Sequence, residues 1–205
     1  MERNRPNEIQ PAKRSPSGAA IRKSSVTDAL VHSFFDEWAR TGYADLSLER
    51  VAKSAGVGKA ALYRRWSSKT DMASDLLAQV GLSITETGDM GSLEADIEAL
   101  LLAIRRVLRH RKIRRVLSDL HAEIEREPAL AEAIRPFQQA RRDRIRGLIE
   151  RAIARGELDK HVDFETIADL LAAPLYWRLV VVRGHSDRQH IKRLARICTA
   201  AAKVL

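Results

Sequence analysis

Apolar residues recur at helical spacing along almost the whole chain from residue 25 onward. Val26, Leu30, Phe34 and Trp38 lie four positions apart, which predicts an amphipathic first helix from residue 25 to the glycine at 42. Similar patterns predict helices over 48–55, 58–66 and 69–84, and then over about 92–109, 112–126, 137–155, 163–183 and 187–203, with a short segment near 129–135. Alternation of β-branched and polar residues is scarce, so the predicted fold class is all-α.

Capping residues and prolines mark the expected helix ends. Ser25 with Asp28, and Ser186 with Gln189, have the spacing of capping boxes and predict helix starts. Pro174 is expected to kink or break the helix over 163–183, because proline has no backbone N–H to donate. Prolines at 128 and 136 bound the short segment between two longer helices.

The first 24 residues differ from the rest in composition. Basic residues outnumber acidic ones six to two in this segment, and three prolines oppose regular structure. We expect a disordered basic arm over 1–24. Two interpretations stay open: the arm only solubilises the protein, or it follows DNA phosphates and enters a minor groove. The remaining chain divides into a unit of short helices, 25–84, and a region of long helices, 85–205.

The distribution of charge points to nucleic acid as a partner. The chain has a net charge of +9 and a pI of about 10.1, which favour an anionic partner. More specifically, the segment from Arg50 to Lys69 holds six Lys or Arg residues and no acid. This basic segment coincides with two short predicted helices that flank a glycine turn.

That arrangement has the form of a helix-turn-helix. Gly56 supplies the unusual backbone angles of the turn, and Val51, Val57 and Leu62 supply its apolar anchors. A major groove is wide enough for one α-helix, so the first helix can brace the second against the base edges.

The segment Ala52–Met72, AxxAGVGKAALYRRWSSKxxM, resembles the signature of TetR/AcrR-type transcriptional regulators, IAxxAGVSxGTLYxHFxSKxxL. The resemblance is specific over about 25–80. Gly58 stands where the family often has a serine cap, Ala60-Ala61 replaces Gly-Thr, and Trp66 replaces phenylalanine. These departures leave the fold expectation intact and put the operator sequence beyond prediction.

The resemblance implies a role for particular residues in binding double-stranded DNA. Tyr63 and Lys69 would contact phosphates, and Ser47 would cap the second helix near the DNA backbone. The groove-facing residues would be Lys59, Ala60, Ala61 and Arg64. A partly buried core position is the alternative for Tyr63, and for Arg65 a solvated surface charge and a DNA contact are both open.

The segment 155–184, with RGE, VD and PLYWRLVVV, resembles one C-terminal subclass of the same family. That resemblance implies a small-molecule effector in a cavity between helices and a homodimer formed through the last two long helices. Apolar stripes agree with such a four-helix interface, although an intramolecular core is the alternative. The stripes comprise Ile167, Leu170, Leu171, Leu175, Leu179 and Val182, and Ile191, Leu194, Ala195, Cys198 and Ala202.

Candidates for the effector pocket are Phe137, Tyr176, Trp177 and His121, with Tyr176 and Trp177 preferred, although an aromatic residue on a helix is more often part of the core. The segment 105–115 holds seven Lys or Arg residues and no acid. It is either a solvated surface or a contact for an anionic ligand or DNA backbone.

Other function classes lack support. The chain has no Walker loop, GxSxG, HExxH or dinucleotide glycine fingerprint, and its six histidines are scattered, so neither an enzyme, a cofactor nor a metal site is predicted. One cysteine, no membrane-length apolar run and no signal peptide favour a cytoplasmic protein. We therefore expect a repressor released by a small molecule, with a ligand-free architectural DNA-binding protein as the alternative.

Overall fold

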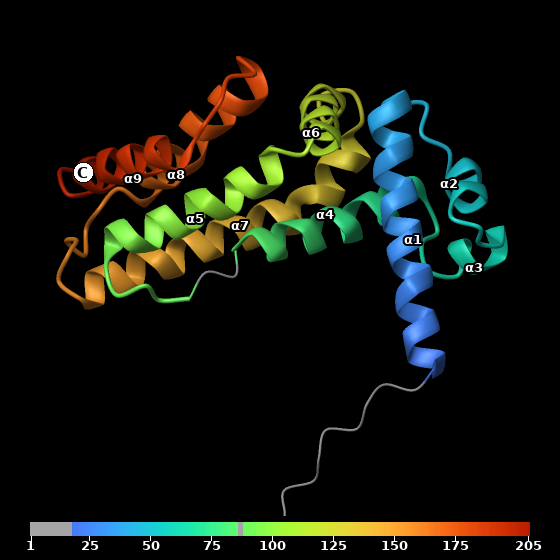
Figure 1. The fold of residues 1–205 in the computed structure, drawn as a ribbon, viewed down its shortest axis with the longest axis horizontal. Coiled ribbons are helices and arrows are strands. Elements are labelled where there is room, and N and C mark those ends of the chain that lie inside the picture. The colour runs from blue at the N-terminus through green and yellow to red at the C-terminus, as the bar shows by residue number, and fades with distance from the viewer. Residues whose placement is uncertain (1–17, 86–87) are drawn as a thin grey trace, which may run out of the picture.

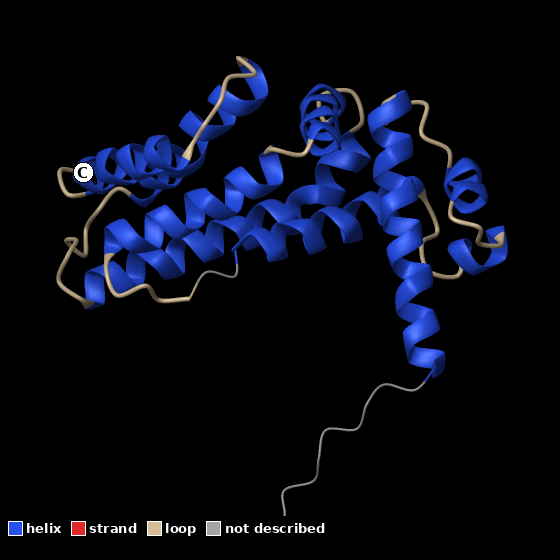
Figure 2. Ribbon diagram, in the orientation of Figure 1, coloured by secondary structure: helices blue, strands red, loops and turns tan. Residues whose placement is uncertain are grey.

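The computed structural model describes residues 18–85 and 88–205, and this part of the chain is helical and contains no strand (Figure 1, Figure 2). The all-α prediction is confirmed. The elements are α1 (Gly18–Thr41), α2 (Leu48–Ser54), α3 (Lys59–Tyr63), α4 (Lys69–Thr85), α5 (Leu93–Leu108), α6 (Arg111–Glu123), α7 (Pro128–Ala154), α8 (Phe164–Tyr176), the π-helix η1 (Trp177–Val181) and α9 (Arg188–Ala202). None of the described helices is both long and apolar enough to cross a membrane.

The helices α1 to α3 gather at one end of the molecule and α8 and α9 at the other (Figure 1). Helix α4 leaves the first end and packs along α7, so these two helices connect both ends. Two apolar cores follow this division. The core at the α1–α3 end contains Leu30, Phe34, Trp38, Val51, Leu62, Trp66, Met72 and Leu76, and also Val116 and Leu120 of α6 and Leu130 and Ile134 of α7. The second core joins α5, the later part of α7, α8, η1 and α9.

Helix α1 begins earlier than predicted. It starts at Gly18, so the expected capping box of Ser25 and Asp28 is wrong: both residues lie inside the helix. The segment GAAIRKS before the apolar stripe contains good helix formers, which let the helix extend backward. Of the predicted disordered arm, 18–24 is helical, and 1–17 lies outside the described residues. Gly42 ends the helix as predicted, with φ of 80°.

Helix α7 is continuous where the sequence predicts two segments. Pro136 lies inside it, and the predicted interruption between 135 and 137 is wrong. Proline removes only one helical hydrogen bond. The buried side chains of Leu130 and Ile134 anchor the first turns in the core that α7 shares with α1 and α4, and this packing keeps the helix intact.

The helix predicted over 163–183 changes from an α-helix to a π-helix after Tyr176, two residues beyond Pro174. Helix α8 ends at Tyr176 and continues as η1, where the backbone N–H of Val182 donates to the carbonyl of Trp177, 3.0 Å away. A π-turn accommodates an extra residue and a lost hydrogen bond, so the expectation of a local break is confirmed. Arg183 then has a φ of 53°, which turns the chain toward α9.

The start of α9 also differs from its prediction. Asp187, not Ser186, is the N-cap, and its carboxylate accepts from the backbone N–H of His190 at 2.7 Å. Ser186 is buried, and its hydroxyl has no hydrogen-bond partner within the described part of the chain. An aspartate cap is favoured because its carboxylate accepts from N–H groups that have no partner in the first turn, and because its negative charge interacts favourably with the positive end of the helix dipole.

Most of the apolar stripe predicted for a dimer interface lies inside one chain. Helix α9 packs against α5 and α8. The residues buried in this core are Ile167, Leu171, Leu175, Leu179, Ile191, Leu194, Ala195, Cys198 and Ala202. The interface prediction is therefore wrong for these side chains, and the intramolecular alternative is correct. Helical periodicity identifies a buried face without identifying what covers it.

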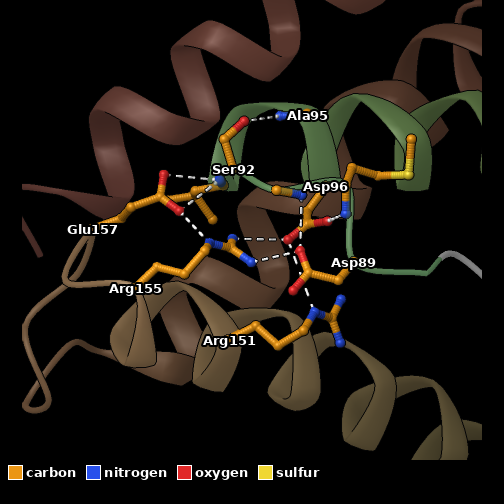
Figure 3. Close-up of polar contacts among 10 residues, drawn as sticks. Asp89, Ser92, Ala95, Asp96, Arg151, Arg155 and Glu157 are labelled. Atoms are coloured by element: carbon orange, nitrogen blue, oxygen red, sulfur yellow. Dashed lines mark hydrogen bonds and ion pairs between the residues drawn. The ribbon is translucent and has the colours of Figure 1, made fainter.

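A network of charges joins the start of α5 to the end of α7 (Figure 3). The Arg155 guanidinium donates to Asp96 at 2.9 Å, to Asp89 at 2.8 Å and to Glu157 at 2.6 Å. Glu157 also accepts from the backbone N–H of Leu93 at 2.9 Å, and this bond, followed by Arg155, lowers the pKa of its carboxyl. Asp96 is fully buried, so its pairing with Arg155 is required for the charge to be tolerated there.

One carboxylate connects α6 to the end of α1. Asp119 accepts from the indole N–H of Trp38 at 2.7 Å and from the backbone N–H of Tyr43 at 2.8 Å. Trp38 is only 1% exposed, so its indole N–H depends on this partner. The helix that follows α5 is thus attached to the loop that leads into α2.

Asp119→Ala should lower the free energy of unfolding by about 1–3 kcal/mol, because it leaves the buried indole N–H of Trp38 without its acceptor. Denaturant unfolding followed by circular dichroism measures this change. The control is Ser118→Ala at the exposed neighbouring position on α6. Equal stability of the two variants would contradict a structural role for the carboxylate.

Candidate DNA-binding surface and ligand cavity

The turn between α2 and α3 is built as the sequence predicts. The Ser47 hydroxyl accepts from the backbone N–H of Arg50 at 3.4 Å and caps α2. Gly56 has a φ of 65°, and the N–H of Val57 donates to the carbonyl of Ala52 at 2.9 Å, which closes the turn. Gly58 begins α3 without a side-chain cap, as expected from its replacement of serine.

Helix α3 is shorter than the predicted 58–66. It ends at Tyr63, and the next residues form turns in which the backbone N–H groups of Arg65 and Trp66 both donate to the carbonyl of Leu62. Of the predicted apolar anchors, Val51 and Leu62 are buried and Val57 is half-buried; Trp66 is buried as well. The indole N–H of Trp66 donates to Asp75 of α4 at 2.9 Å, which attaches the segment that follows α3 to α4.

Most of the predicted groove-facing residues lie on one exposed surface. Lys59, Ala60 and Arg64 are exposed, and Ala61 is half-buried. Tyr63 is 45% exposed, so it is not the buried core aromatic of the alternative interpretation. Lys59 is paired with Glu49 at 2.5 Å, but both side chains are exposed, and such a pair is readily exchanged for a phosphate.

Besides Lys59, three of the six cations between Arg50 and Lys69 make contacts within the chain. Lys69 donates to the carbonyls of Tyr43 and Ala44 at 2.8 and 2.9 Å, with its ammonium 4.5 Å from the ring of Tyr43. Arg65 donates to the hydroxyl of Thr27 and lies over the ring of Trp66 at 4.8 Å. These contacts hold the loop before α2 and the first helix in place, a role that the sequence does not reveal.

Arg50 is the third of these cations. It donates to the Glu37 carboxylate and to the carbonyl of Asp45. Burial opposes ionisation of Glu37, but hydrogen bonds from Arg40 and Arg50 outweigh that effect and lower its pKa. The buried carboxylate therefore stays charged and orients Arg50 beside α2.

A cavity of about 1270 Å³ lies between α5, α6, α7 and α8. Its walls are mostly aliphatic, and Phe35 of α1 and Leu77 of α4 also border it. Both of these residues belong to the core at the α1–α3 end. The cavity therefore touches the helices that position the helix-turn-helix.

All four candidates for the effector pocket border this cavity: Phe137, Tyr176, Trp177 and His121. The Tyr176 hydroxyl lies 3.1 Å from Nδ1 of His121, and burial raises the pKa of this phenol. Trp177 is 60% exposed and lies on η1. The sequence did not identify Arg141 and Asp169, which also line the cavity.

The basic segment 105–115 makes several contacts within the chain. Arg105 donates to the carbonyl of Ser186, and Arg114 donates to the carbonyls of Leu108 and Arg109 at 3.1 and 3.2 Å. Lys112 forms an ion pair with Asp36 of α1. These cations therefore help to hold the α5–α6 turn, α9 and α1 together.

Comparisons with known proteins agree with this arrangement. The model for bacterial regulatory proteins of the tetR family matches residues 35–83, and that for the tetracyclin repressor-like C-terminal domain matches 87–198. The HTH-type transcriptional regulator YdeS of Bacillus subtilis is 27% identical over 174 residues, which cover 84% of this chain and 87% of YdeS. The DNA-binding transcriptional repressor TetR of Mycobacteroides abscessus is 31% identical, over 76% of this chain and 82% of its own. The crystal structure of the TetR family transcription regulator SCO0332 is 26% identical, has a TM-score of 0.66, and is matched over 86% of this chain and 97% of that one.

Tyr63→Phe should weaken binding to every DNA sequence by about threefold to tenfold, since it would remove the hydrogen bond that we expect from the Tyr63 hydroxyl to a phosphate. Arg64→Ala should instead reduce discrimination between bases, by about 1–3 kcal/mol if the guanidinium contacts guanine in two places. Fluorescence anisotropy on native and scrambled DNA separates the two effects. Arg126→Ala, an exposed charge on the turn between α6 and α7, is the control. Unchanged binding by both test variants would show that another surface contacts DNA.

Proposed function

The chain belongs to the TetR family of transcriptional regulators, and we propose from that premise that it is a repressor released from its operator by a small molecule in the α5–α8 cavity. It is a DNA-binding regulator, not an enzyme. We place the DNA-binding domain at 25–84 and the effector-binding and dimerisation domain at 85–205. The observation that carries the proposal is that one helix, α6, borders both the cavity and the DNA-binding domain.

Helix α6 contacts the cavity through some side chains and the DNA-binding end of the molecule through others. Leu117, Leu120 and His121 line the cavity, while Asp119 binds Trp38 and the backbone N–H of Tyr43. A ligand that displaces α6 would therefore move the loop before α2. Release of DNA requires that the ligand bind the displaced arrangement more tightly than the DNA-bound one. Lys69, Tyr63 and Ser47 would keep their proposed roles near DNA phosphates.

A homodimer would present two copies of α3, the helix proposed to enter the major groove, to an operator with two-fold symmetry. We assign its interface to the outer faces of α8 and α9, because the inner faces are buried in the chain's own core. Ile197 supports this assignment, since it is 64% exposed on α9. Leu170 of α8 is half-buried, and its carbonyl accepts from the Cys198 thiol at 3.5 Å, which places the two helices side by side.

The decisive experiment is fluorescence anisotropy of the full chain on DNA from its own upstream region and on scrambled DNA, across a salt series and with a panel of small molecules. We expect preference for the native sequence, and release by a molecule that binds the cavity. Ala172→Phe, which fills part of the cavity, should keep DNA binding and lose the response. Equal, salt-labile binding to both DNAs would instead favour an architectural protein.

Ile197→Glu should convert the dimer to a monomer and weaken operator binding, because it places a charge in an apolar contact. Sedimentation equilibrium measures the change in assembly. Ile197→Val keeps the apolar surface and is the matched control. A variant that remains dimeric would place the interface on another face.

A further inference from the structure

The cavity combines apolar walls with an excess of basic groups. Aliphatic side chains from α5 and α6 form much of its surface, including Leu100, Ile104 and Leu117. The basic residues that border it are Arg141, Arg142, Arg178, His121 and His190, and the one carboxylate among its described lining residues is that of Asp169. An uncharged ligand would leave this excess of positive charge without a neutralising partner.

Most of these basic groups already have partners. Arg142 forms an ion pair with Glu165 and lies 6.0 Å from the ring of Phe164. Arg178 donates to the carbonyl of His185. Burial, followed by the nearby arginines, lowers the pKa of His190 and favours its neutral form.

Arg141 differs from the other two arginines. Among the described residues, no carboxylate oxygen lies within ion-pair distance of its guanidinium. The Arg141 side chain is exposed at the open cavity, and desolvation by the neighbouring protein, followed by the charge of Arg142, lowers its pKa. Asp169 acts in the opposite direction without reaching ion-pair distance. A guanidinium that faces an apolar cavity without an ion-pair partner can bind the anionic group of a ligand.

We propose that the effector is an amphipathic organic anion whose carboxylate or phosphate group binds the Arg141 guanidinium while its apolar body fills the cavity. This inference rests on the proposed function of the cavity as the effector site. A guanidinium presents paired N–H donors that match either oxyanion. The cavity volume of about 1270 Å³ exceeds the usual range for small-ligand pockets, about 300–1,000 Å³, so the apolar body is long or contains several rings.

Four alkyl probes of equal chain length test the head group: dodecanoate, dodecyl phosphate, dodecan-1-ol and dodecylammonium. Isothermal titration calorimetry with the full chain, below the micelle concentration of each probe, gives their affinities. At least one of the two anions should bind about ten to a hundred times more tightly than the alcohol. The anion that binds more tightly identifies the head group, and dodecylammonium should bind most weakly because it meets like charges.

Arg141→Met keeps an unbranched apolar stem and removes the guanidinium charge, so it should abolish the preference for the anion while retaining binding of the alcohol. Arg141→Lys should keep part of the preference. Arg135→Met, on the same helix and in an exposed pair with Glu132, is the control and should behave like the unmodified chain. Melting curves establish that each variant is folded.

Asp169→Asn provides a test in the opposite direction. It removes the negative charge that faces the cavity, so it should tighten binding of the anion and leave binding of the alcohol unchanged. A purely structural role for Asp169 would change both affinities together.

Equal binding of anion and alcohol, an anion preference that survives Arg141→Met, or no binding of any probe would overturn the inference. The DNA-binding assay distinguishes failure of this inference from failure of the proposed repressor function. Release of DNA by dodecan-1-ol alone would support a ligand-released repressor and overturn an anionic effector. Failure to prefer native DNA would contradict the proposed repressor whatever the cavity binds.

Discussion

The attachment of Asp119 to Trp38 and Tyr43 is the constraint on which the arrangement of the two ends depends. Without it, α6 would contact α1 through apolar side chains and the exposed ion pair of Lys112 with Asp36, which fix distance better than orientation. With it, a carboxylate on α6 specifies the position of the turn that follows α1. Gly42 is adapted to the same contact. It has a positive φ, and a Cβ at this position would approach the Asp119 carboxylate to 3.1 Å.

From that turn, a chain of polar contacts leads to the DNA-binding surface. The carbonyls of Tyr43 and Ala44 accept from Lys69, and the ring of Tyr43 lies beside the same ammonium. Lys69 is the first residue of α4. The same helix carries Asp75, which accepts from the indole N–H of Trp66 just after α3. Charge, aromatic packing and hydrogen bonds to backbone carbonyls therefore meet around one short loop and attach the inner side of the strongly basic segment to the rest of the domain.

The sequence was most informative where the physical cause is local. Ser47 and Gly56 could be assigned because a helix cap and a left-handed turn depend on one residue each. Val51 and Leu62 were recognised as apolar anchors of the turn, and both are buried. Pro136 and Ser25 were misinterpreted because packing and neighbouring helix formers override a local preference. Arg141 was missed because its meaning depends on three other helices that meet around it, a property that periodicity along one helix does not contain.

The short π-helix η1 has a consequence for how this wall of the cavity can change over evolutionary time. A π-helix corresponds to one residue inserted into an α-helix, and each inserted residue rotates the downstream side chains about the helix axis by about 100°. Val181 and Val182, which lie at the downstream end of η1, owe their places beside the cavity to that rotation. Loss of a single codon here would restore a regular helix and turn both side chains at once. The pocket can therefore acquire a new lining in one genetic step, without a substitution anywhere in its other walls.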